Sequence, residues 1–143
     1  MKDIIKKLKK MYPLNDHFSF NQNGVLKNDC NAPKDSAGIY IIFHKEEIIY
    51  IGRSGRIDNG GKVKIRKNGL YERIVNGTQF KQKRHISLPI KMKEEGIGFL
   101  KIYWLVTHNK EKTYKDSTAY VEVYLLNEYL NKHQKLPKWN KEL

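Results

Sequence analysis

Cysteine, acidic residues and long apolar runs are all scarce in this chain. Its single cysteine, Cys30, can form neither an intramolecular disulfide nor a cysteine-based metal cluster, which is typical of a reducing cytoplasm. No apolar run approaches the ~20 residues that a membrane helix needs. The N-terminal residues are basic and periodic, which does not fit a secretory signal. These absences predict a cytoplasmic protein with no membrane partner.

Positive charge, in contrast, is abundant. The chain has 28 Lys and Arg residues against 15 Asp and Glu residues, a formal net charge of +13. A field of this sign attracts polyanions. Nucleic acid is the first partner to expect, because neutralising its phosphates releases condensed counterions. An anionic membrane surface is the second, and a basic protein with no polyanionic partner is the third.

The length of 143 residues, with no internal repeat and no linker, predicts a single domain. The expected elements are a helix over 1–11, mostly loop over 13–36, a β-hairpin over 38–52, a helix over 70–76, a helix from near Ser87 to Gly96 with Pro89 in its first turn, a strand over 99–106 and a helix over 118–132 capped by Asp116 or Ser117. This order predicts an α+β fold, with a small three-stranded antiparallel sheet flanked by helices. The domain would consist of an N-terminal extension, 1–36, and a core, 37–143, with a basic insert at 53–68.

The hairpin carries two similar triplets, Gly38-Ile39-Tyr40 and Tyr50-Ile51-Gly52. Because strand side chains alternate between faces, Tyr40 and Tyr50 share a face only where paired residue numbers sum to an even number. A hairpin loop of three or five residues gives that parity. The sequence therefore predicts an odd-length loop and two tyrosines on one face, although either tyrosine alone would be an ordinary sheet aromatic.

Glu122 lies in the predicted C-terminal helix, where its helical neighbours are apolar: Ala119, Leu125, Leu126 and Tyr129. A carboxylate in such a stripe needs a partner or a metal ion. The alternatives are a peripheral glutamate and a structural salt bridge. Arg73 follows Leu70 in the short helix, where its guanidinium could bind phosphate or simply face solvent.

Together these motifs resemble those of the GIY-YIG nuclease superfamily. Both name-giving triplets stand without substitution, Leu70 to Arg73 fits the family's L-x-x-R pattern, and Ala119 to Glu122 fits its glutamate motif. Asn140 is the candidate for an asparagine that many members carry near the end. The resemblance covers residues 38–140, and it implies a metal-dependent endonuclease that hydrolyses the phosphodiester bonds of double-stranded DNA and leaves 5′-phosphate ends.

The resemblance also implies a role for each site residue. Tyr40 would activate or orient the attacking water, and Tyr50 would help to position the water or the phosphate. Arg73 would stabilise the charge of the transition state, and Glu122 would hold one Mg²⁺ or Mn²⁺ ion per active site. Gly38, Gly52 and Asn140 would support them.

Two physical expectations accompany these roles. A free tyrosine has a pKa near 10 and is a poor base, but nearby cations favour its phenolate, and this part of the chain is rich in them. One protein carboxylate makes a weak metal site, so metal binding without DNA should be poor.

The insert is expected to contact DNA. Its basic residues oppose a single Asp58 and could follow a phosphate backbone, or form an ordinary solvated loop; they are Arg53, Arg56, Lys62, Lys64, Arg66 and Lys67. A second tract could extend this surface: Lys81, Lys83, Arg84 and His85. Gly77 stands where several family members have a histidine, and His85 is not assigned to the catalytic set.

A second hypothesis is a DNA- or RNA-binding module that keeps the fold but not the catalysis. The sequence is compatible with a homodimer, and it does not separate restriction, repair, mobile-element and phage nucleases. Metal-dependent cleavage distinguishes the enzyme from the binding module.

Overall fold

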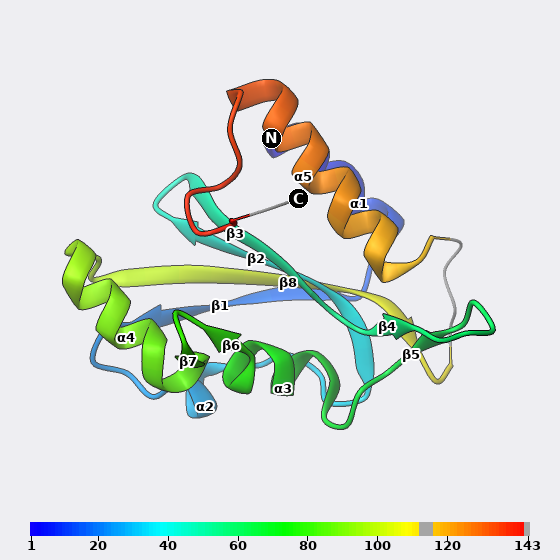
Figure 1. The fold of residues 1–143 in the computed structure, drawn as a ribbon, viewed down its shortest axis with the longest axis horizontal. Coiled ribbons are helices and arrows are strands. Elements are labelled where there is room, and N and C mark those ends of the chain that lie inside the picture. Colours follow the sequence, from blue (N-terminus) through cyan, green and yellow to red (C-terminus); the bar gives the residue numbers. More distant parts are fainter. Residues whose placement is uncertain (112–115, 142–143) are drawn as a thin grey trace.

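A computed structural model describes residues 1–111 and 116–141. The chain has an α+β fold around a four-stranded antiparallel sheet with the strand order β1-β8-β2-β3 (Figure 1). These strands are β1 (Asn15–Asn21), β8 (Phe99–Asn109), β2 (Ser36–His44) and β3 (Glu47–Ser54). The inner strand β2 is apolar over most of its length because both of its faces are covered.

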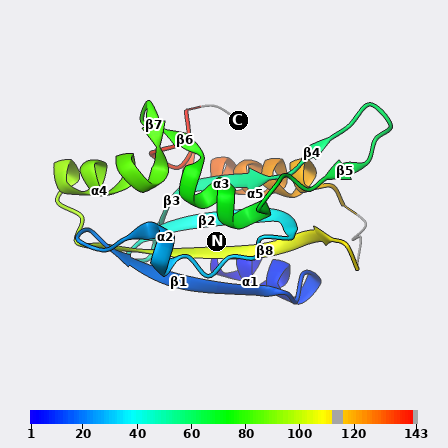
Figure 2. The same cartoon turned by 90° about the horizontal axis from the view of Figure 1, so that it is seen from below.

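Helices cover both faces of the sheet (Figure 1, Figure 2). One face packs against α2 (Leu26–Asp29), α3 (Gly69–Asn76) and α4 (Arg84–Glu95), and the other packs against α1 (Lys2–Met11) and α5 (Thr118–His133). Strand alternation sends Tyr40 and Ile42 to the first face, and Ile39 and Ile41 to the second. We call these the tyrosine face and the α1/α5 face.

The sheet has one strand more than the predicted three. β1 lies within residues 13–36, which the sequence predicted to be mostly loop, and it pairs with β8 from Asn15↔Leu105 to Asn21↔Phe99. Most of its residues are polar, so the alternation of buried and exposed side chains was not recognised. Phe18 and Phe20 are buried, and their neighbours in the strand are exposed. Because β1 is an edge strand with one buried side, two phenylalanines are enough to dock it.

The hairpin between β2 and β3 confirms the shared face of the tyrosines but not the predicted odd-length loop. Its loop has two residues, Lys45 and Glu46, because His44 pairs with Glu47. A β-bulge then shifts the register between Phe43↔Ile48 and Ile42↔Tyr50, which leaves Ile49 as the extra residue. The paired numbers therefore change from an odd sum to an even one, and the tyrosines point to the same side.

The other elements agree with the sequence more closely. The helices expected over 1–11, 70–76 and 118–132 are α1, α3 and α5, and the strand expected over 99–106 is β8, which extends to Asn109. Ser117 caps α5, since its hydroxyl accepts a hydrogen bond from the amide of Tyr120 at 3.1 Å. Within residues 1–111 and 116–141, no helix is both long enough and apolar enough to cross a membrane.

Two segments differ from expectation around α3. The insert is not a structureless loop, because β4 (Arg56–Ile57) and β5 (Val63–Lys64) form a small hairpin that projects from the body (Figure 2). After α3, a second small hairpin, β6 (Thr78–Gln79) with β7 (Gln82–Lys83), leads directly into α4. α4 therefore begins at Arg84 rather than near Ser87, and Pro89 lies inside the helix rather than in its first turn.

Candidate active site

The glycines of the two triplets make room for close contacts. A Cβ atom on Gly52 would lie 2.6 Å from the Tyr40 hydroxyl and 2.8 Å from a Tyr50 ring carbon, so only glycine lets both rings lie over this point of β3. A Cβ on Gly38 would overlap the carbonyl oxygen of Leu105 in β8. The tyrosine rings lie 5.9 Å apart between centroids. The triplets thus build a glycine-floored pair of tyrosines.

Tyr40 has no exposed surface, whereas Tyr50 is partly exposed. The hydroxyl of Tyr40 accepts a hydrogen bond of 3.0 Å from the Arg84 guanidinium. The same guanidinium carbon lies 5.0 Å from the Tyr40 ring centroid and 5.6 Å from that of Tyr50. One buried arginine therefore contacts both tyrosines.

Arg84 is only 1% exposed and bonds to protein oxygens with all three of its nitrogens. Besides Tyr40, it donates to the Gln79 side chain at 2.9 Å and to the backbone carbonyls of Arg73 and Ile74 at 2.6 and 2.9 Å. The last two carbonyls end α3, so Arg84 caps the helix that carries Arg73. It connects the tyrosine pair to that helix.

The sequence prediction placed Arg84 in an exposed basic tract, and this was wrong. The missed signal is its spacing: Arg84 lies four residues before Leu88 and eight before Met92, on the buried side of α4. Gly77 is what admits it, because a Cβ there would lie 3.2 Å from an Arg84 nitrogen. The space beside Gly77 is therefore filled by an arginine side chain. Burial lowers the pKa of His85, and the charges of Lys27 and Lys83 lower it further.

The pKa of Tyr50 is raised above its ordinary value. Burial is the main cause and the nearby Tyr40 adds to it, while Arg84 and Arg73 act in the opposite direction. The expectation that nearby cations would favour a tyrosine phenolate is thus not met at Tyr50, where loss of solvent outweighs their attraction. Tyr50 keeps its proton at neutral pH and is suited to orient a water molecule or to donate a hydrogen bond.

Glu122 lies on α5, which packs against the other face of the sheet. Its side chain is 22% exposed, and one carboxylate oxygen lies 3.4 Å from Nε of Arg53 at the end of β3. Burial raises the pKa of Glu122, and the charges of Arg53 and Arg73 only partly offset it. The partner that the apolar stripe demanded is therefore Arg53, through one long contact that leaves acceptor capacity on the carboxylate.

Arg73 is exposed and is close enough to affect the titration of both Tyr50 and Glu122. Arg73 on α3 therefore neighbours both Tyr50, which packs beside Tyr40, and Glu122 on α5. Among the described residues there is no group of three His, Cys, Asp or Glu side chains that could hold a metal ion. A metal ion here would bind to Glu122 and otherwise to water and substrate oxygens, and the spare acceptor capacity of this carboxylate fits that use.

Asn140 supports β3 by imitating a neighbouring strand. Its side chain accepts a hydrogen bond from the Ile51 amide and donates one to the Ile51 carbonyl, both at 2.9 Å. The amide of Trp139 also donates to the Ile49 carbonyl at 2.9 Å. The C-terminal tail thereby binds the free edge of the strand that carries Tyr50, at the middle residue of its triplet.

The basic residues of the insert are exposed, apart from the partly buried Arg53. A hollow of about 610 Å³ lies between the insert and α3, lined by Arg56, Lys64, Ile65, Arg66, Lys67, Asn68 and Glu72. A smaller hollow of about 110 Å³ shares Arg66 and Glu72 with it and includes Arg73. Lys62 is exposed near the hairpin tip, outside both hollows. A basic surface thus runs from the insert to Arg73.

No protein-family model, curated protein or solved structure matches the chain.

Proposed function

We propose that this chain is a metal-dependent endonuclease of the GIY-YIG type, which hydrolyses phosphodiester bonds in DNA. The observation that carries the proposal is Arg73, an exposed cation whose charge reaches both Tyr50 on β3 and Glu122 on α5. These residues are far apart in the sequence, and a structural role alone gives no reason for them to meet. The basic insert beside them supports a polyanionic substrate.

The burial of Tyr40 changes the division of roles between the tyrosines. A side chain without exposed surface is poorly placed to meet a water molecule, so we assign the position next to the attacking water to Tyr50. Tyr40 and Arg84 are positioning residues that hold the Tyr50 ring and the end of α3 in place. Because Tyr50 keeps its proton, it orients the water rather than deprotonating it in the free protein.

The remaining steps use the charged residues. Arg73 stabilises the negative charge that develops on the phosphate, and Glu122 would hold the Mg²⁺ or Mn²⁺ ion, which when bound supplies Lewis acidity and lowers the pKa of a bound water. The water oxygen forms a bond to phosphorus while the bond from phosphorus to the 3′ oxygen breaks. The products are a 5′-phosphate and a 3′-hydroxyl. The leaving 3′ oxygen takes up one proton, which balances the proton that the attacking water loses.

The insert supplies contacts to the DNA backbone. Its exposed basic residues are positioned for phosphate contacts and not specifically for base recognition. Arg53 is held by Glu122 in the free protein, and it would be available to a phosphate once a cation shares that carboxylate. The buried free thiol of Cys30 suits a reducing compartment, and we place the enzyme in the cytoplasm.

The test is cleavage of supercoiled plasmid with Mg²⁺ or Mn²⁺ and with EDTA. We expect nicking or cutting only with metal, and a loss of at least about 100-fold for Arg73→Ala and Glu122→Gln. Glu128→Gln is the matched control, because Glu128 is also a partly buried carboxylate and lies six residues further along the same helix. Unchanged cutting by Glu122→Gln would overturn the assigned roles. Metal-independent binding without cleavage of any DNA form would favour the catalytically silent binding module.

A further inference from the structure

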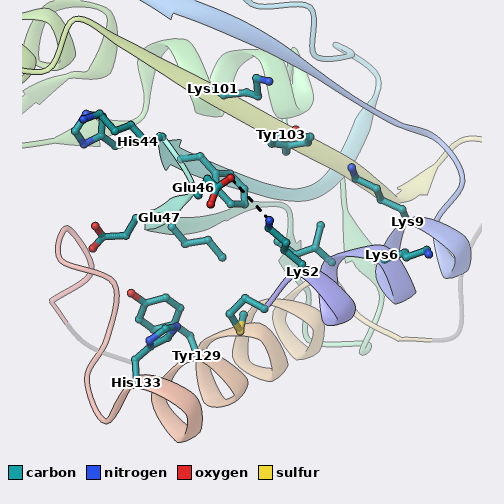
Figure 3. A pocket seen from close by; sticks show the side chains of 15 residues that line it. Lys2, Lys6, Lys9, His44, Glu46, Glu47, Lys101, Tyr103, Tyr129 and His133 are labelled. Atoms are coloured by element: carbon teal, nitrogen blue, oxygen red, sulfur yellow. Dashed lines mark ion pairs between the residues drawn. The ribbon is translucent and has the colours of Figure 1, made fainter.

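A third hollow lies on the α1/α5 face, on the opposite side of the sheet from the tyrosine pair (Figure 3). Its volume is about 940 Å³, and its walls come from α1, the tip of the β2–β3 hairpin, β8 and the end of α5. This is near the upper end of the range for small-molecule sites. None of the residues assigned to catalysis lines it.

The inner surface of this groove is apolar and aromatic. Phe43 and Tyr103, both partly exposed, meet edge to face with their ring centroids 5.2 Å apart. Ile5, Ile48 and Tyr129 complete the inner surface and are almost wholly buried. The ring of His17 also lies 4.9 Å from that of Tyr103, so the inner surface of the groove is one side of an aromatic cluster.

Lysines surround that inner surface. Lys2, Lys6 and Lys9 come from one side of α1, at spacings of four and three residues, and Lys45 and Lys101 come from the hairpin tip and β8 (Figure 3). The opposing carboxylates are Glu46 and Glu47. The ion pair between Lys2 and Glu46 measures 3.9 Å with both side chains at least 85% exposed, so it neutralises little. Lys9 lies 4.5 Å from the centroid of the Tyr103 ring.

We propose that this groove binds a segment of single-stranded nucleic acid. Aromatic rings beside a row of cations are the arrangement that such strands require, because unstacked bases lie against the rings while the phosphates meet the lysines. A duplex offers no unstacked base to the rings of the groove. The proposal is independent of cleavage, and it would give the protein a second contact with DNA on the side away from the active site.

The experiment measures the binding of a fluorescein-labelled oligothymidylate of eight nucleotides by anisotropy, in EDTA, so that no cleavage is involved. The groove variant is Lys6→Gln with Lys9→Gln. The matched control is Lys7→Gln with Lys10→Gln, which removes the same charge from the same helix outside the groove. We expect the groove variant to bind at least about 5-fold more weakly than the control. We also expect its salt dependence to fall by about 1.4 log units per log unit of salt, for two lost phosphate contacts.

A third variant tests the stacking. Tyr103→Leu keeps an apolar side chain but removes the ring, and we expect about a 10-fold loss of affinity for the oligothymidylate. Its affinity for an abasic strand of equal length should not change. Circular dichroism checks that each variant is folded.

Three results would overturn the proposal. One is equal weakening by the two lysine pairs, and another is an unchanged affinity of Tyr103→Leu for the base-bearing strand. The third is a duplex that competes as well as the single strand at equal phosphate concentration. Loss of a wild-type dimer in the groove variant would instead show that a second copy of the chain occupies the groove.

Discussion

Glu95 on α4 and Glu122 on α5 have nearly the same exposure, with side chains 25% and 22% exposed. Each has two basic side chains nearby, Lys91 and Lys138 for Glu95, and Arg53 and Arg73 for Glu122. Their pKa values nevertheless shift in opposite directions, lowered at Glu95 and raised at Glu122. The exposed fraction and the number of nearby cations do not by themselves explain the difference, because Glu122 is surrounded by more protein than Glu95.

Direct hydrogen bonds add to this difference in burial. Burial alone would raise the pKa of Glu95, but Lys138 at 2.7 Å, the Trp139 indole at 3.1 Å and Lys91 at 3.3 Å outweigh it. Glu122 has one contact, at 3.4 Å. Glu95 is thus a saturated carboxylate that fastens the C-terminal tail to α4, while Glu122 keeps acceptors free for a ligand. The loss of folding free energy on removing a charged group should therefore be larger when more of its hydrogen-bonding atoms have partners.

Arg84 is the most completely bonded charge, and its loss should have the largest effect on folding. Arg84→Met leaves four oxygens without their donor, and we expect the free energy of unfolding to fall by about 3–5 kcal/mol in urea denaturation. Arg66→Met, at an exposed site, should change it by less than about 0.5 kcal/mol. Arg84→Lys keeps the positive charge but lacks the planar guanidinium. We expect this variant to fold, and to cut DNA more slowly than the wild type does. A wild-type rate for that variant would remove Arg84 from the site.

Glu95→Gln should have a smaller effect, about 1–3 kcal/mol of destabilisation at pH 7. Glu122→Gln should leave the protein as stable as wild type, or more so. The lowered pKa of Glu95 means that its contribution exists above its ordinary pKa of 4.5 and is lost as the pH falls through its value in the folded protein.

The raised pKa of Glu122 gives its contribution to stability the opposite pH dependence. Its protonated form favours folding below pH 4.5, and that contribution is lost as the pH rises through the higher value in the folded protein. Thermal unfolding of both variants from pH 4 to pH 8, compared with the wild type, measures these two pH dependences. The comparison would fail if both substitutions destabilised the protein equally at pH 7.

The smallest effect should come from Mg²⁺ added without DNA. One carboxylate binds this ion weakly, and a ligand present at its own Kd stabilises a protein by only about 0.4 kcal/mol. We therefore expect millimolar Mg²⁺ to shift the melting temperature of the wild type very little, and that of Glu122→Gln not at all. A large shift retained in Glu122→Gln would locate the metal elsewhere.

Much of the fold could be predicted because local patterns dominate it. The apolar spacing of α1, α3 and α5 and the run of β8 fix elements whose buried side is visible in the sequence. β1 could not be recognised, since an edge strand with only Phe18 and Phe20 buried resembles a polar loop. The bulge at Ile49 also escaped prediction, because either register satisfies a strand that is apolar on both faces.

Residue type and motif agree for Tyr50, Arg73 and Glu122, and the structure places Arg73 close to the other two, while their roles stay predictions. Arg84 was missed because a basic residue within a basic tract is normally exposed, and only the three-dimensional position of Gly77 reveals the space that it fills. A buried charge depends on partners from several elements, and a single sequence does not show those partners.

The tail also bears on the order in which the tyrosine pair is assembled during synthesis. Trp139 bonds to the bulge residue Ile49, and Asn140 bonds to Ile51, so these two residues hold β3 in the register that points Tyr50 toward the tyrosine face. They leave the ribosome after the whole of the sheet has been made. A nascent chain therefore has both tyrosines long before it has the residues that keep β3 in this register.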